Sequence, residues 1–103
     1  MIGIVATLKV QDGKHAEFEG VFKQLMAKVR ANEPGNVAYQ LCKSRADANT
    51  YKVLELYNDQ AALDAHRASD HFRSLGREMG AYMDGRAEGR DARRGVGVAF
   101  YRS

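Results

Sequence analysis

The sequence predicts an α+β domain of the ferredoxin-like βαββαβ type, with a four-stranded antiparallel sheet and helices on one face. Apolar residues alternate in four short segments, as in half-buried strands. Between these segments the apolar spacing changes to that of amphipathic helices, once after the first strand and once before the last. At 103 residues the chain is predicted to form a single domain over residues 1–103.

The first strand is predicted over Ile2–Val10, because every even-numbered residue there is apolar. The turn residues Gln11–Gly13 end it. From Lys14 the apolar residues follow a helical stripe, which consists of Phe18, Val21, Phe22, Leu25, Met26 and Val29. The helix is expected to stop at Asn32–Gly35, since proline disfavours helical backbone in the residue before it.

The second half begins with a predicted hairpin of strands Asn36–Lys43 and Thr50–Tyr57, joined by a polar turn. Asn58-Asp59 supplies a helix N-cap for a short helix over Gln60–His66. Ser69-Asp70 is a second cap, which opens a helix whose apolar face is Phe72, Leu75, Met79 and Tyr82. A glycine- and arginine-rich loop follows, and the last strand is predicted over Gly95–Tyr101.

The predicted strand over residues 50–57 is apolar on both faces, and this indicates a homodimer. Tyr51, Val53 and Tyr57 point to one side, and Leu54 and Leu56 point to the other. Helices on one face of the sheet leave the other face as an apolar patch in water. We therefore expect a two-fold homodimer that forms through the open sheet face.

Composition excludes several other classes of partner. The net charge of +3 comes from 16 basic and 13 acidic residues, and the arginines near the C-terminus alternate with acids, so no basic stripe indicates nucleic-acid binding. The single cysteine, Cys42, cannot form an internal disulfide. No apolar run approaches the ~20 residues of a membrane span, and no signal-peptide pattern is visible. We expect a cytoplasmic protein with no membrane partner.

Several spaced motifs resemble those of the antibiotic-biosynthesis-monooxygenase family, which consists of dimeric α+β barrels of the ferredoxin-like type. The matching motifs are Asp12–Lys14, Glu33–Asn36, Glu55–Asp59, Ala62–His66 and Ser69–Phe72. They occur in the family's order and extend over nearly the whole chain. The resemblance implies a dimeric α+β barrel and a chemistry drawn from the family's range: quinol and anthrone oxidation, heme degradation, or isomerisation of a signalling sugar.

The heme-degrading branch of this family does not fit the residues. Its members carry an Asn late in the first strand, a Trp in the first half of the broken helix and a heme-ligating His in the second half. An ungapped alignment places Thr7, His66 and Gly76 at these positions, and the chain contains no Trp. Glycine cannot ligate iron, so heme degradation is disfavoured.

The quinol-oxidising branch resembles this chain more closely, because its members have His at both His66 and His71. The resemblance implies a cofactor-independent monooxygenase that oxidises a small aromatic quinol or polyphenol with O₂, without metal, flavin or nicotinamide. In that reading the catalytic residues are His66 and His71, with a pKa near 6.5 suited to proton transfer. The alternative roles are a packing histidine for His66 and a half-exposed side chain for His71.

A shared metal site is the competing interpretation of the two histidines. Their separation of five residues places them about 140° apart on a continuous helix. Zinc-binding pairs on helices use separations of three or four residues. The break at Ser69-Asp70 allows a different geometry with Asp70 as a third ligand, but nothing in the sequence requires it. We expect no metal.

The substrate-binding residues expected from the same reading are Tyr39, Glu55, Tyr57, Phe72, Phe22 and Met79. Glu55 shares strand parity with Tyr57, so an interior position buries its carboxylate and requires an Arg or Tyr partner. A structural ion pair across the dimer is the alternative to a catalytic acid. Tyr39 and Tyr57 either bond a quinone oxygen or satisfy backbone groups. The apolar residues form either a wall for a flat substrate or ordinary core.

Two further functions remain open at this point. One is an isomerase or lyase of a small oxygenated metabolite that uses the same histidine as a proton shuttle. The other is a non-catalytic ligand-binding or stress-response dimer. The loop Gly85–Arg94 is expected either to close over the pocket through its arginines or to be a solvated connector.

Overall fold

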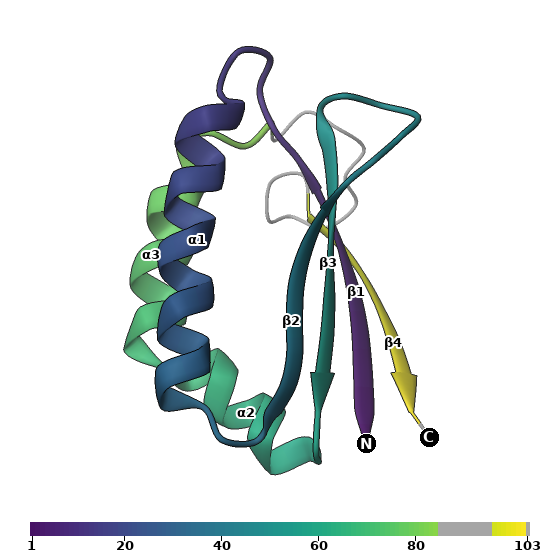
Figure 1. Ribbon diagram of the computed structural model, residues 1–103, viewed down its shortest axis with the longest axis vertical. Coiled ribbons are helices and arrows are strands. Elements are labelled where there is room, and N and C mark those ends of the chain that lie inside the picture. The colour runs from purple at the N-terminus through teal and green to yellow at the C-terminus, as the bar shows by residue number, and fades with distance from the viewer. Residues whose placement is uncertain (85–95, 103) are drawn as a thin grey trace.

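The computed structural model describes residues 1–84 and 96–102 and has the predicted order of elements. The elements are β1 Ile2–Lys9, α1 His15–Asn32, β2 Asn36–Lys43, β3 Thr50–Tyr57, α2 Gln60–Ala68, α3 Asp70–Gly80 and β4 Val96–Arg102. The four strands form one antiparallel sheet in the order β2-β3-β1-β4 (Figure 1). This is the ferredoxin-like arrangement, so the predicted fold class is confirmed.

All three helices lie on one face of the sheet, as the sequence predicts (Figure 1). The strictly alternating burial along β1 places its even-numbered residues under the helices. The helix stripe is confirmed, since Phe18, Val21, Phe22, Leu25 and Val29 are the buried residues of α1. These side chains form a hydrophobic core with Tyr39, Tyr51 and Val53 of the sheet.

The two halves of the broken helix begin at the predicted caps. The Asp59 side chain accepts a hydrogen bond from the backbone N–H of Ala62, and Ser69 Oγ accepts one from that of Phe72. Both bonds satisfy N–H groups that the first turn of a helix leaves without an internal partner. The first half extends to Ala68, two residues beyond the predicted end at His66.

The sheet differs from the predicted pattern at one end of β2. Simple alternation places Val37 on the same face as Tyr39, but the pairing of β2 with β3 shifts register between Asn36 and Ala38, which is a β-bulge. Val37 is therefore 52% exposed while Tyr39 is buried. Periodicity alone does not reveal an extra residue in a strand, so simple alternation assigns Val37 to the wrong face.

The outer face of the sheet carries the second set of apolar residues that the sequence predicts. Leu54 is 44% exposed and Tyr101 is 61% exposed. Val5 and Leu56, which are half-buried, lie on the same face. No helix covers this side of the sheet among residues 1–84 and 96–102 (Figure 1).

The C-terminal end of α3 is tied to the end of β1. The Gln11 amide donates to the carbonyl oxygen of Met83 at 3.0 Å, and the Asp84 N–H donates to that of Lys9 at 2.8 Å. The strand predicted to Val10 ends at Lys9, and Val10 instead forms an isolated bridge to Met83. The predicted loop Gly85–Arg94 lies outside the described residues. In the described part of the chain, no helix has the length and apolar character needed to cross a membrane.

Candidate active site between the helices and the sheet

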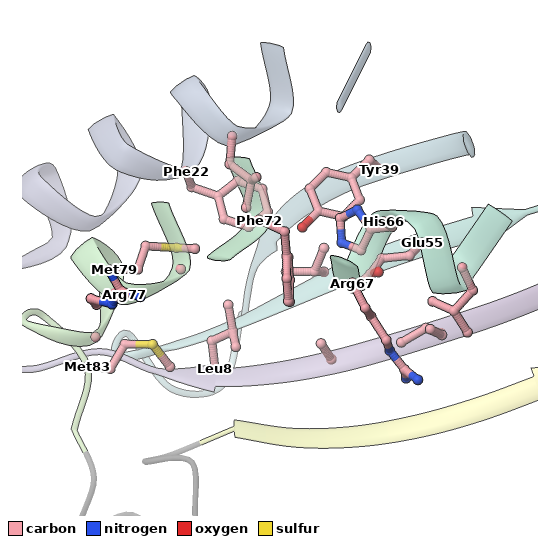
Figure 2. A pocket seen from close by; sticks show the side chains of 17 residues that line it. Leu8, Phe22, Tyr39, Glu55, His66, Arg67, Phe72, Arg77, Met79 and Met83 are labelled. Carbon is pink, nitrogen blue, oxygen red and sulfur yellow. The ribbon is translucent and has the colours of Figure 1, made fainter. Parts of the chain in front are cut away.

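A cavity of about 480 Å³ lies between the three helices and the sheet. Its wall is mainly apolar, with Phe22, Phe72 and Met79 contributed by helices. The polar side chains that line it are Tyr39, Glu55, His66, Arg67 and Arg77. Figure 2 shows Tyr39, Glu55, His66 and Arg67 toward one end of the cavity, and Arg77, Met79 and Met83 toward the other. An apolar cavity with a few convergent polar groups is typical of a site for a small organic molecule.

His66 is held in place by Glu33, which comes from the turn between α1 and β2. The imidazole Nδ1 lies 2.9 Å from Glu33 Oε1 and 3.0 Å from Oε2. His71 Nε2 bonds the same carboxylate at 2.5 Å. The side chains of Glu33 and His66 are 8% and 2% exposed, so this contact is buried. One carboxylate thus binds both histidines of the broken helix.

The second nitrogen of the His66 ring has no protein partner. Nε2 is buried, and it makes no hydrogen bond to any residue within 1–84 and 96–102. Around the ring pack Tyr39, Tyr57 and Phe72, with centroid distances of 5.2, 5.4 and 4.6 Å. A buried polar atom without a partner is rare in folded proteins and carries a free-energy cost. A ligand hydroxyl in the cavity is the natural partner for this atom.

The protonation state of His66 follows from its surroundings. Burial lowers the pKa of His66, and it outweighs the opposing effect of Glu33. The ring is therefore neutral at pH 7 and carries one N–H. Because a carboxylate only accepts hydrogen bonds, that hydrogen is on Nδ1, and Nε2 presents a lone pair. His66 thus lines the cavity as a neutral imidazole whose Nε2 lone pair has no partner in the described chain.

Glu55 is a second titratable group that lines the cavity. Its Oε1 accepts a hydrogen bond from the Tyr57 hydroxyl at 2.8 Å, so the Tyr partner that the sequence predicts is present. Burial raises the pKa of Glu55 to about 7, while the Tyr57 bond and the charge of Arg67 act in the opposite direction. The negative charge of Glu33 contributes a smaller rise.

The raised pKa of Glu55 predicts a pH-dependent contribution to stability. Between pH 4.5 and about 7 the unfolded chain has lost this proton and the folded chain retains it, so stability falls as pH rises. The full shift corresponds to about 3 kcal/mol of unfolding free energy. Glu55→Gln is expected to remove this slope, as measured by urea unfolding from pH 5 to 8. The control is Glu19→Gln, whose carboxylate also binds a tyrosine hydroxyl, that of Tyr51, but does not line the cavity. Parallel curves for wild type and Glu55→Gln contradict the prediction.

The structure brings most of the predicted site residues to the cavity. His66, Tyr39, Glu55, Phe22, Phe72 and Met79 all line it. Two predicted residues do not: His71 bonds Glu33, and Tyr57 donates to Glu55 and packs against the ring of His66. Thr7, compared above with an Asn of heme-degrading relatives, bonds Lys52 instead of facing the cavity.

Glu33 is a residue of the candidate site whose contact with His66 the sequence patterns do not reveal, since they indicate only a helix stop and a family motif there. It is separated from His66 by 33 residues in the sequence, so only the fold brings the two together. A close backbone approach makes this possible: a Cβ on Gly35 would lie 2.5 Å from the Cβ of Ala62. The signal available in the sequence is an acidic residue directly before Pro34-Gly35. Among the described residues, no group of three or more Asp, Glu, His or Cys side chains is arranged to hold a metal ion.

Comparison with known proteins identifies the family. The model of the antibiotic biosynthesis monooxygenase family matches residues 1–77. The chain is 35% identical over 75 residues to "Putative monooxygenase YcnE" of Bacillus subtilis (strain 168), which covers 73% of this chain and 78% of that protein. A crystal structure from Caulobacter crescentus CB15, named for the same family, is 46% identical with a TM-score of 0.85, over 97% of this chain and 86% of the other.

A more distant structure shares the fold. SnoaB from Streptomyces nogalater, described as a cofactor-independent oxygenase, is 22% identical with a TM-score of 0.77, over 99% of this chain and 93% of the other. At this identity the likeness concerns the fold alone. The family match over residues 1–77, together with the relatives of 35% and 46% identity, shows that this chain belongs to the antibiotic biosynthesis monooxygenase family.

Proposed function

We propose that this protein is a cofactor-independent monooxygenase that oxidises a small aromatic quinol or polyphenol with O₂. The observation that carries the proposal is the unpartnered Nε2 of His66 at the wall of an apolar cavity. A phenolic hydroxyl both satisfies this atom and gives it the proton that activates the substrate. Family membership supports an oxygenase, and the cavity supports an aromatic substrate.

The reaction begins when His66 takes a proton from the quinol. The imidazolium that forms is stabilised by Glu33, which already accepts the Nδ1–H. The resulting quinol anion is electron-rich and reduces O₂, and the two combine as a peroxide. For each O₂ consumed, one oxygen atom enters the product and the other leaves as water. The substrate loses two hydrogens, so atoms and electrons balance.

The remaining site residues hold the substrate and exclude water. A flat ring fits against Phe22, Phe72 and Met79, which line the cavity. The Tyr39 hydroxyl has no hydrogen-bond partner in the part of the chain that the structure describes, and burial raises its pKa, so it stays protonated and donates to a quinone oxygen. His71 acts through Glu33, and is therefore a positioning residue in this scheme.

The test of the proposal is oxygen uptake by the purified protein with a panel of hydroquinones. We expect uptake above the rate of autoxidation for at least one member, with equal amounts of O₂ consumed and oxygenated product formed. Uptake at the autoxidation rate for every member contradicts the proposal. Turnover of a small keto compound or sugar under nitrogen instead indicates the isomerase or lyase, because such a reaction does not use O₂.

We also propose that two copies of the chain associate through the outer face of the sheet. Val5, Leu54, Leu56 and Tyr101 present apolar surface on this face, and a second copy offers the same surface in return. Burial of a few hundred Å² per copy contributes several kcal/mol before the cost of association, at ~25 cal/mol per Å².

The dimer proposal predicts a mass close to twice the 11.4 kDa of the chain. Light scattering coupled to size exclusion measures it directly. Leu54→Glu places a charge in the centre of the apolar patch and is expected to give a monomer. Gln24→Glu, on the exposed surface of α1, is the control and is expected to leave the mass unchanged. A wild-type mass near 11 kDa at micromolar concentration contradicts the dimer.

A further inference from the structure

A half-buried carboxyl group that lines an apolar cavity requires an explanation. Glu55 lines the cavity together with His66, and its only hydrogen bond within residues 1–84 and 96–102 comes from Tyr57. No Lys, Arg or His among these residues lies within ion-pair distance of it. Burying an acid without a cation destabilises the fold. Within these residues Glu55 therefore has no ion-pair partner, and the expected ion pair across the dimer stays a prediction.

Glu55 and His66 belong to the same end of the cavity. Tyr57 contacts both: its ring lies 5.4 Å from the imidazole of His66, and its hydroxyl donates to Glu55. Tyr39 of β2 also packs against the His66 ring. A ligand whose hydroxyl reaches His66 Nε2 therefore lies at the end of the cavity that Glu55 also lines (Figure 2).

We propose that Glu55 is the proton donor in the last step of the oxygenation, so that the cavity works with an acid and a base on separate residues. This inference rests on the proposed function. After O₂ has added, the proton on His66 returns to the peroxide and gives a hydroperoxide. At this stage His66 is again neutral, and Glu55 still carries its proton.

The breakdown of the hydroperoxide needs both groups at once. His66 removes the hydrogen from the carbon that bears the peroxide, and the electron pair of that C–H bond forms the new C=O bond. The O–O bond breaks, and its electron pair leaves with the outer oxygen. Glu55 gives its proton to that oxygen, which departs as water. A proton then returns from His66 to Glu55, and the site is restored.

The surroundings of Glu55, and burial above all, keep it able to play this role. Burial raises its pKa to about 7, so a large fraction holds a proton at neutral pH. The titratable or charged groups that face it or share its cavity are Tyr57 on β3 itself, Tyr39 on β2, Glu33 before β2, His66 and Arg67 on α2, and Arg77 on α3 at the far end. The neighbouring strand β1 places the apolar Ile4 opposite Glu55. A proton donor is most effective when its pKa lies near the working pH.

The test compares wild type, Glu55→Gln and the control Glu19→Gln with an active hydroquinone under ¹⁸O₂. A glutamine keeps the size of the side chain but has no proton to give. We expect the ¹⁸O-labelled product formed per O₂ to fall about tenfold or more in Glu55→Gln. Without the proton from Glu55, the hydroperoxide instead releases hydrogen peroxide and leaves unlabelled quinone. These two products together contain all the atoms of the quinol and O₂. Glu19→Gln is expected to match wild type. An unchanged ratio of labelled product to O₂ in Glu55→Gln overturns the inference.

A second measurement separates this inference from the proposed function. The infrared band of a protonated carboxyl is recorded at pH 6 under nitrogen, with and without 4-fluorophenol, which the protein does not oxidise in the absence of O₂. We expect a band that is absent in Glu55→Gln and that shifts when the phenol binds. A shift without any oxygen uptake refutes the oxygenase and leaves Glu55 as a proton carrier facing the ligand. A carboxyl band that does not shift when the phenol binds refutes the role of Glu55, whether or not the protein takes up oxygen with hydroquinones.

Discussion

The variant His66→Asn is expected to lower the kcat of oxygen uptake with an active hydroquinone by about 10²–10⁴-fold, the usual contribution of a positioned base. An asparagine amide still donates to Glu33 in place of Nδ1, so the buried carboxylate keeps its partner. The substitution removes Nε2, the lone pair that accepts the substrate proton. Binding of the ring against the apolar wall is largely retained, and KM is expected to change less than kcat.

Two controls accompany this variant. His15→Gln changes a histidine that bonds Asn49 at 2.9 Å and does not line the cavity, and it is expected to leave uptake unchanged. Thermal unfolding of His66→Asn establishes that the fold is intact. Uptake within twofold of wild type by the folded variant removes His66 as the base of the reaction.

The variant Gly35→Ala is expected to destabilise the fold by about 1–3 kcal/mol, the usual range for overpacking. The new methyl group would lie 2.5 Å from the Cβ of Ala62, and neither atom can move without its backbone. Relief therefore requires α2 to shift, and α2 carries His66. For a domain of about this size, each kcal/mol lowers the Tm by roughly 4–8 °C. We expect lower oxygen uptake as well, since Glu33 and His66 separate.

A double variant identifies the cause. Ala62→Gly alone costs about 0.5–1 kcal/mol, because glycine is a poor helix residue. The Ala62→Gly change also removes the atom that the new methyl group at position 35 would meet. The next nearest atom to that methyl group is the Cα of residue 62, at 3.5 Å. The stability loss of the double variant, Gly35→Ala with Ala62→Gly, is therefore expected to be smaller than the sum of the single losses by about 1 kcal/mol or more. Strictly additive losses show that the close contact is not the reason for the glycine.

Much of the fold follows from local patterns in the sequence. The two periods of apolar residues predict every strand and helix, and the caps at Asp59 and Ser69 predict the break between α2 and α3. Strand parity also predicts that Glu55 faces the helices, where it is half-buried, and Tyr57 is one of the two kinds of partner expected for it. The bulge at Val37 is not predictable in this way, because one extra residue leaves no mark in composition.

The site is less predictable than the fold, for two physical reasons. An apolar stripe such as Phe22 and Met79 has the same spacing whether it fills a core or lines a cavity, and only the distance between the layers decides. The role of Glu33 depends on contacts with His66 and His71, which lie 33 and 38 positions further along the chain. The sequence suggests that His66 and His71 act together, and the structure connects them through Glu33, with only His66 at the cavity.

The protonation state of His66 can be read from the ¹⁵N NMR spectrum of the protein with labelled histidine at pH 7 under nitrogen. We expect His66 to be neutral, with a protonated Nδ1 and an unprotonated Nε2. Addition of a hydroquinone is expected to shift the Nε2 resonance of His66 and to leave that of His15 unchanged. Three results would contradict the assignment of His66 as the base that activates the substrate. They are a charged His66, a proton on Nε2, and an Nε2 resonance that does not shift at saturating hydroquinone.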